Sequence, residues 1–104
     1  MIVTTTPTVE GRKIEEYLGI VAGEVALGTD FIRDFAAQLA DFFGARTTGY
    51  EQNLVEARAA CIREMTDRAA RMGANAIVGC KIDHEILTNG MMLVLSTGTA
   101  VKLA

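Results

Sequence analysis

The residues best suited to chemistry in this sequence are two cysteines, Cys61 and Cys80, and a single histidine, His84. Thiolate and imidazole are the ligands that soft and borderline metals such as zinc prefer. Cys80 and His84 lie four residues apart in a predicted strand, which separates them by about 13 Å. Because zinc holds its ligands at about 2.0–2.3 Å, these two side chains cannot share one ion. The cysteines also form no CxxC pair, so we expect both to be reduced, buried and apolar in role, with no metal site within one chain.

Two other groups of polar residues are candidates for ion binding. Asp83 and Glu85 share one face of the same predicted strand about 7 Å apart, with Lys81 beside them. They could hold a hard cation weakly, although a charged solvent-facing surface is the interpretation we favour. Arg46, Thr47 and Thr48 precede a predicted helix, whose N-terminus attracts anions. A small-anion site and a capped helix with an interfacial arginine both fit this pattern, and we favour the capped helix.

Enzymatic, nucleic-acid and membrane functions find little support in the sequence. It has no GxGxxG, no phosphate-binding GxxxxGK and no GxSxG nucleophile elbow, so we assign no catalytic residue and no cofactor. The net charge of −3 and pI near 5.0 argue against a nucleic-acid binder. We find neither a secretory signal nor about 18 consecutive apolar residues, and we expect a cytoplasmic protein.

The element that must position these residues is a long amphipathic helix predicted over Thr48–Met72. Thr48 and Glu51 fit a capping box at its start, and Gly73 is placed to end it. A second helix is predicted from Thr29 or Asp30, ending at Gly44. Its apolar face would carry Phe31, Ile32, Phe35, Leu39, Phe42 and Phe43.

Strands are predicted at Ile2–Thr6, at Tyr17–Val25 and in a C-terminal hairpin. Asn89-Gly90 is a strong signal for a two-residue hairpin loop. That loop would pair Ile86 with Leu93 and put both on the more apolar face. The other pairs in this register are His84–Leu95, Ile82–Thr97, Cys80–Thr99 and Val78–Val101. Gly98, in the second strand, indicates a bulge or a close backbone approach, although a glycine without a role is equally compatible.

The chain resembles the YbjQ-like family of small bacterial proteins of unknown function, often labelled "putative heavy-metal-binding". The matching stretches are TTTPTVEG at Thr4–Gly11, GARTTGYEQNLVEAR at Gly44–Arg58, GANAIVG at Gly73–Gly79, and NGMMLV with STGTAV within Asn89–Val101. Ala45, Cys80 and His84 depart from the family's usual residues. The resemblance implies helices packed on an antiparallel sheet and assembly as a ring, typically a pentamer.

We therefore predict a single α+β domain over residues 1–104. An antiparallel sheet would carry two helices, in the order β-β-α-α-β-β, and form the subunit of a homo-oligomeric ring. Half of the residues are hydrophobic and the mean hydropathy is +0.26, so some apolar surface should be buried between subunits. The leading hypothesis is a non-enzymatic module that holds a small ligand or metal between subunits. The alternatives are a purely structural or protein-interaction oligomer and, third, an enzyme whose site is assembled between subunits.

Overall fold

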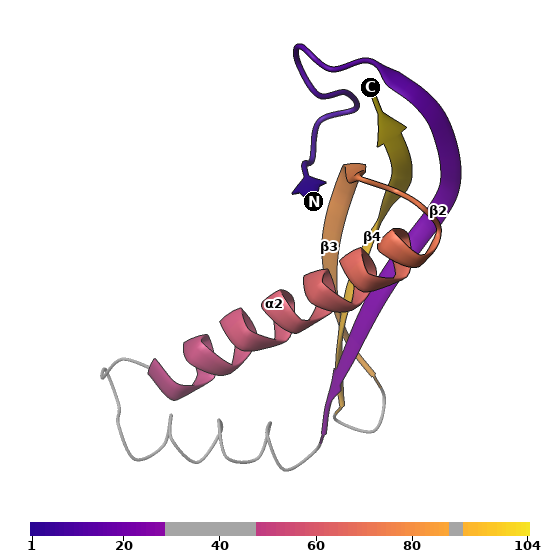
Figure 1. The fold of residues 1–104 in the computed structure, drawn as a ribbon. Helices are drawn as coiled ribbons and strands as arrows, with labels where there is room; N and C mark the ends of the chain where they lie inside the picture. Colours follow the sequence, from indigo (N-terminus) through magenta and orange to yellow (C-terminus); the bar gives the residue numbers. More distant parts are fainter. Residues whose placement is uncertain (29–47, 88–90) are drawn as a thin grey trace, which may run out of the picture.

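A computed structural model describes residues 1–28, 48–87 and 91–104 as a curved sheet crossed by one long helix (Figure 1). The elements are β1 (Ile2–Val3), β2 (Ile14–Leu27), α2 (Thr48–Arg71), β3 (Ala76–Ile86) and β4 (Met92–Leu103). The strand order is β1-β3-β4-β2, which makes β4 an inner strand and β2 an edge strand. The long helix is confirmed, and it ends one residue before the predicted Met72.

The predicted fold of two helices on an antiparallel sheet is wrong. The described residues contain one helix, and the sheet is mixed, because β1 runs parallel to β3 with Ile2 beside Ala76. The other two strand pairs are antiparallel. A parallel neighbour needs a long crossover, and β2 and α2 lie between β1 and β3 in the chain. The predicted helix from Thr29 or Asp30 to Phe43 lies outside the described residues.

The hairpin register differs from the prediction by one residue. Ile86 pairs with Met92 instead of Leu93, and His84 pairs with Val94 instead of Leu95. The ladder continues to a hydrogen bond of 2.7 Å from the Leu87 N–H to the Met91 carbonyl, so the connection is longer than a two-residue loop. Asn89 and Gly90 themselves lie outside the described residues. Side chains alternate between the two faces of a strand. A one-residue slip therefore gives each residue near the connection a partner that the prediction had placed on the opposite face.

A bulge in β3 sets which side chains face α2. Val78 pairs with Thr99 and Lys81 pairs with Thr97, which leaves Gly79 and Cys80 opposite Gly98. Gly79 has a φ of +61°, which a glycine adopts at little cost. A Cβ on Gly98 would meet the Ile77 side chain and lie 3.3 Å from the Val78 carbonyl oxygen, so the strands are close there.

The helix backbone lies in close contact with Gly23 of β2. A Cβ at this position would collide with the carbonyl oxygen of Cys61 and lie 2.9 Å from the backbone nitrogen of Met65. The hydroxyl of fully buried Ser96 lies beneath the same turn of α2 and donates to the Cys61 carbonyl at 3.1 Å. The core between helix and sheet includes Val21, Ala57, Cys61, Met65, Ala69, Ile77, Cys80, Val94 and Ala100. The absence of a side chain at Gly23 therefore sets the distance between the two layers.

The helix ends in a Schellman motif that turns the chain into β3. The Gly73 N–H donates to Ala70 and the Ala74 N–H donates to Ala69, both at 3.0 Å, and Gly73 has a φ of +91°. The Asn75 side chain then exchanges two hydrogen bonds with the backbone of Leu103, of 2.7 and 3.1 Å. The described helical residues contain no stretch apolar and long enough to cross a bilayer.

We predict that Gly23→Ala destabilises the fold by at least about 2 kcal/mol, since an added methyl group must push the helix backbone away from the sheet. Urea unfolding at fixed protein concentration measures this. Gly28→Ala is the matched control, because a Cβ there would meet no atom within 4 Å. Equal stability of the two variants would contradict the tight contact at Gly23.

Candidate functional site

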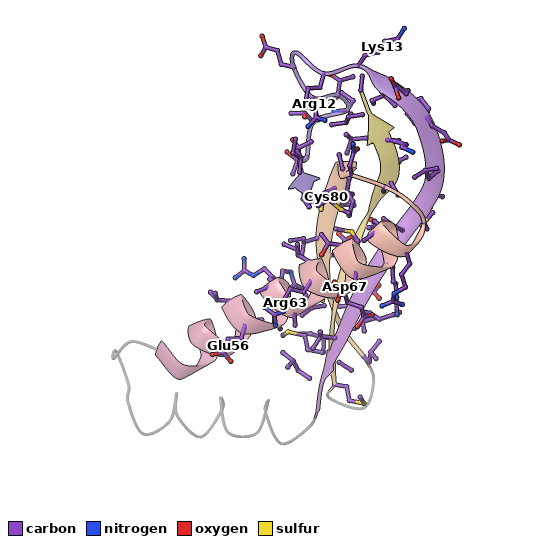
Figure 2. All side chains as sticks on the ribbon, in the orientation of Figure 1. Arg12, Lys13, Glu56, Arg63, Asp67 and Cys80 are labelled. Atoms are coloured by element: carbon purple, nitrogen blue, oxygen red, sulfur yellow. The ribbon has the colours of Figure 1, made fainter. Side chains whose placement is uncertain are left out.

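The two cysteines both lie between α2 and the sheet, in different apolar clusters. Cys61 of α2 is fully buried, and its Sγ donates a hydrogen bond of 3.1 Å to the Val94 carbonyl of β4. Cys80 of β3 is also buried, in the cluster that contains Met65 and Ala69 of the helix. In Figure 2, Cys80 lies on β3, whereas Arg63 and Asp67 are polar side chains of the helix. Both thiols are free and both take part in packing.

The environment of both thiols opposes their ionisation. Burial raises the pKa of Cys61, and the negative charges of Glu64 and Glu24 raise it further. These effects outweigh a backbone hydrogen bond from Val25, which favours the thiolate. Burial alone raises the pKa of Cys80. Because the thiolate is the form that binds metal, neither cysteine is prepared as a ligand near neutral pH.

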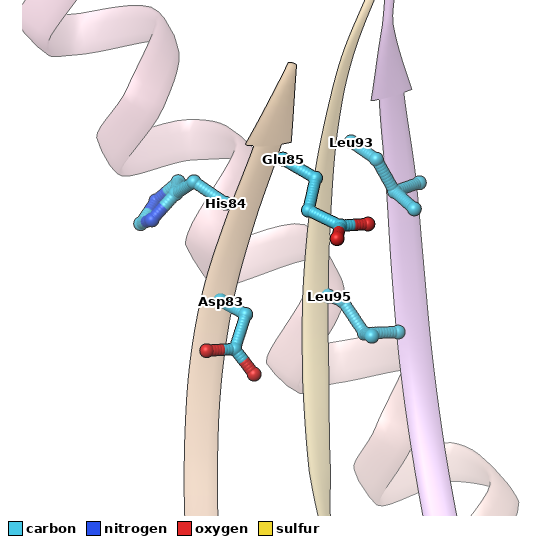
Figure 3. A pocket seen from close by; sticks show the side chains of 5 residues that line it. All are labelled: Asp83, His84, Glu85, Leu93 and Leu95. Carbon is cyan, nitrogen blue, oxygen red and sulfur yellow. The ribbon is translucent and has the colours of Figure 1, made fainter. Parts of the chain in front are cut away.

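His84 is an exposed residue of β3, four residues after Cys80 in the chain. Its imidazole points away from the neighbouring side chains of the sheet (Figure 3). Among the described residues, no three His, Cys, Asp or Glu side chains come close enough to hold one metal ion. The chain's cysteines and its histidine are all described, so the donor set of one chain does not fit a soft-metal centre.

The described residues do form a shallow hollow on the sheet face opposite α2. Its volume is about 340 Å³, and its lining is Asp83, His84, Glu85, Leu93 and Leu95. Asp83 and Glu85 project from β3 on the side where Leu93 and Leu95 project from β4 (Figure 3). Lys81 lies 3.4 Å from the Asp83 carboxylate. The hollow thus combines two carboxylates with two apolar side chains.

The sequence prediction missed the two leucines of this hollow. The shifted register moves Leu93 and Leu95 from the helix side to the side of Asp83 and Glu85. The available signal was the run MMLVL at residues 91–95, which is apolar at successive positions and so supplies apolar side chains to both faces.

The two interpretations of Arg46, Thr47 and Thr48, an anion site or a capped helix, concern side chains that lie outside the described residues. Arg46 and Thr47 are not among the described residues, and neither are the side chains of Thr48 and Glu51. The helix does begin at Thr48. Of the other residues singled out for structural roles, Gly73 lies in the turn after α2 and Gly98 opposite the β3 bulge.

We predict that the free energy of unfolding of the reduced protein falls as the pH rises above about 9, the ordinary pKa of a cysteine thiol. A thiol whose pKa is raised by folding stabilises the protein below its unfolded pKa, and that contribution is lost as pH rises through the folded pKa. Urea unfolding between pH 7 and pH 10.5 measures the slope. The Cys61→Ser, Cys80→Ser variant should lose less stability over this range, and identical slopes would contradict the burial argument.

Comparison with known proteins agrees with the family resemblance over the whole chain. Residues 1–104 match the family model YbjQ, described as "Putative heavy-metal-binding". A UPF0145 protein of Acetivibrio thermocellus is 56% identical over 105 residues, covering 99% of each chain. A UPF0145 protein of Geobacillus kaustophilus is 54% identical over 103 residues, covering 99% of this chain and 98% of its own.

The fold also resembles a solved structure of low sequence identity. It is the crystal structure of a DUF74-family protein of unknown function from Pediococcus pentosaceus, with a TM-score of 0.60 and 19% identity. The match covers 100% of this chain and 98% of that one, and at this identity it supports the fold alone. The family match over residues 1–104 and these two relatives together show that this chain belongs to the YbjQ family.

Proposed function

We propose that this protein is a non-enzymatic module that works by associating with copies of itself. The supporting observation is the apolar centre of the sheet face opposite α2, here called the open face. Near the β3–β4 connection this centre is formed by Leu93 and Leu95 of β4. On the same face β2 contributes Ala22, Glu24 and Ala26, and β3 contributes the charged residues Lys81, Asp83 and Glu85. A pentameric ring, or a multiple of it, is the assembly that the family resemblance predicts.

The inner strand β4 carries the argument for association. Met92 and Val94 are buried on the helix side, and Leu93 and Leu95 lie half-buried on the open face. A strand that is apolar on both faces is typical of a sheet covered on both sides. Among the described residues, α2 covers one side of this part of β4. A second copy of the chain would supply the missing cover.

Two further properties support the same proposal. Ile20 is 84% exposed and Tyr17 is 68% exposed, which is costly for large apolar side chains in an isolated subunit. The radius of gyration is 16.8 Å, whereas a compact domain of this length would have a radius of about 13 Å. An elongated subunit leaves more surface available for contacts between copies.

The geometry gives less support to a soft-metal carrier. Both thiols are buried with raised pKa values, and no three His, Cys, Asp or Glu side chains of the described residues could hold one metal ion. We propose that any small ligand is held between copies of the chain. Free buried cysteines are also typical of proteins in a reducing compartment, and we propose the cytoplasm.

We predict that the protein is oligomeric at micromolar concentration in sedimentation velocity. An 11.2 kDa monomer alone would contradict the proposed function. Ile20→Lys should weaken association while leaving the fold intact, because this side chain is largely exposed in the single subunit. Val55→Lys on α2, where the side chain is 54% exposed, is the control away from the open face and should leave association unchanged.

We predict that the reduced protein binds zinc or cadmium weakly and without fixed stoichiometry, since the buried thiols are protonated at neutral pH. Calorimetric titration of the wild type and the Cys61→Ser, Cys80→Ser variant at pH 7 tests this. Similar weak heats are expected from both proteins. A tight stoichiometric site that disappears in the variant would show that the cysteines do bind metal as the family label states.

A further inference from the structure

The hollow near the β3–β4 connection sets a row of carboxylates beside a row of leucines. In the strand register Asp83 lies opposite Leu95, and Glu85 lies opposite Leu93. The Cβ atoms of such cross-strand neighbours are about 4.5–5.5 Å apart, so each carboxylate stands beside one leucine. Figure 3 shows the Glu85 side chain extending from β3 toward β4. A molecule in the hollow would therefore meet acidic groups along one side and apolar groups along the other.

Cations of the chain already accompany two of the three carboxylates on this part of the open face. Lys81 lies 3.4 Å from the Asp83 carboxylate. Glu24 of β2 lies on the same face, and its carboxylate is 3.5 Å from Arg68. Glu85 has no cationic partner among the described residues. The negative charge that remains for a ligand is therefore that of Glu85.

The combination of a free carboxylate and two leucines selects the chemical class of ligand. A neutral apolar molecule would remove water from the Glu85 carboxylate without replacing its hydrogen bonds, which is costly. An anion would be repelled by the carboxylates. A metal ion needs several donor atoms at about 2.0–2.6 Å, and no three His, Cys, Asp or Glu side chains of the described residues could supply them. An ammonium group on an apolar body satisfies both sides of the hollow.

We propose that the hollow binds a small organic cation, with its ammonium group on Glu85 and its apolar body on Leu93 and Leu95. Because Lys81 already accompanies Asp83, one positive charge completes the site. The volume of about 340 Å³ lies at the lower end of the range of small-molecule sites, which limits the ligand to a short body. The proposal deepens the proposed function and rests on it, since a second copy over the open face would enclose the ligand.

The probe for this site is hexylammonium, titrated into protein with labelled leucine methyl groups. Saturable NMR shifts are expected at the methyl groups of Leu93 and Leu95. Hexanoate has a similar body with the opposite charge, and methylammonium has the charge without the body. Both should bind at least about tenfold more weakly, because each lacks one half of the recognition. Equal binding of either control, or no saturable shift with hexylammonium, would overturn the proposal.

Two charge variants should change the affinity for hexylammonium in opposite directions. Glu85→Gln should raise the Kd at least about fivefold, because it removes the carboxylate that meets the ammonium group. Lys81→Gln should lower the Kd at least about twofold, because it releases Asp83 to attract the ligand. Opposite shifts of this kind cannot come from a general loss of folding.

The matched controls for these variants are Glu15→Gln and Lys13→Gln. They change the net charge by the same amounts, but they lie at the far end of the sheet, around the start of β2 (Figure 2). Both should leave the Kd nearly unchanged. If Glu85→Gln binds as tightly as Glu15→Gln, or if Lys81→Gln does not bind more tightly than Lys13→Gln, the assignment of the ammonium group to this hollow is wrong.

Sedimentation velocity on the same samples separates this proposal from the proposed function. An oligomer whose Leu93 and Leu95 signals do not respond to hexylammonium would overturn the ligand site and leave self-association in place. A monomer would overturn the proposed function. Binding to that monomer with the charge dependence given above would support the ammonium site and contradict only its enclosure by a second copy.

Discussion

The close contact between the helix backbone and Gly23 is the constraint on which the rest of this structure depends. It brings the Cys61 carbonyl within reach of the Ser96 hydroxyl and buries the Cys61 thiol against Val94. Glu64 and Arg68, one and two turns further along α2, then reach the outer backbone of β2. The same contact thus packs the core and protects one edge of the sheet. The helix meets β2 and β4 more extensively than β3, and among the described residues β4 is the strand that pairs with the second half of β3.

Local signals in the sequence predicted the elements whose ends they encode. The end of α2 just before Gly73 follows from local capping chemistry, and the helix begins at Thr48, the residue at which the sequence predicted its start. The parallel direction of β1 could not be predicted from the sequence, because a strand of two residues carries no periodicity. Its partner, β3, also lies more than 70 residues further along the chain. The hairpin register also failed, because β4 is apolar on both faces near its start. Pattern alone therefore could not correct a one-residue error in the assumed loop.

Some features of the candidate site could likewise be predicted from local sequence, whereas others depend on strand register or tertiary packing. Burial of Cys61 and Cys80 could be inferred from their positions in apolar patterns, and the structure confirms it. The hollow could not be inferred, since the meeting of Leu93 and Leu95 with two carboxylates depends on the register. The hydrogen bonds of Glu64 and Arg68 to the outer backbone of β2 could not be predicted either, because in the sequence these two residues form an ordinary i,i+4 pair. Their contacts with Ala22 and Glu24 require the tertiary approach of the helix.

The two thiols belong to the core of this fold, whereas the charged residues of β3 belong to its surface. A thiol that can capture a soft metal needs a low pKa and access to solvent. Cys61 instead donates a hydrogen bond to the Val94 carbonyl, and Cys80 is buried within the β3 bulge. The accessible polar groups are instead the backbone and the alternating charges of residues 81–85, next to an apolar face. The soft donors of this chain are therefore part of the core, and the described surface near the β3–β4 connection presents two carboxylates and Lys81 beside two leucines, groups that soft metals do not prefer.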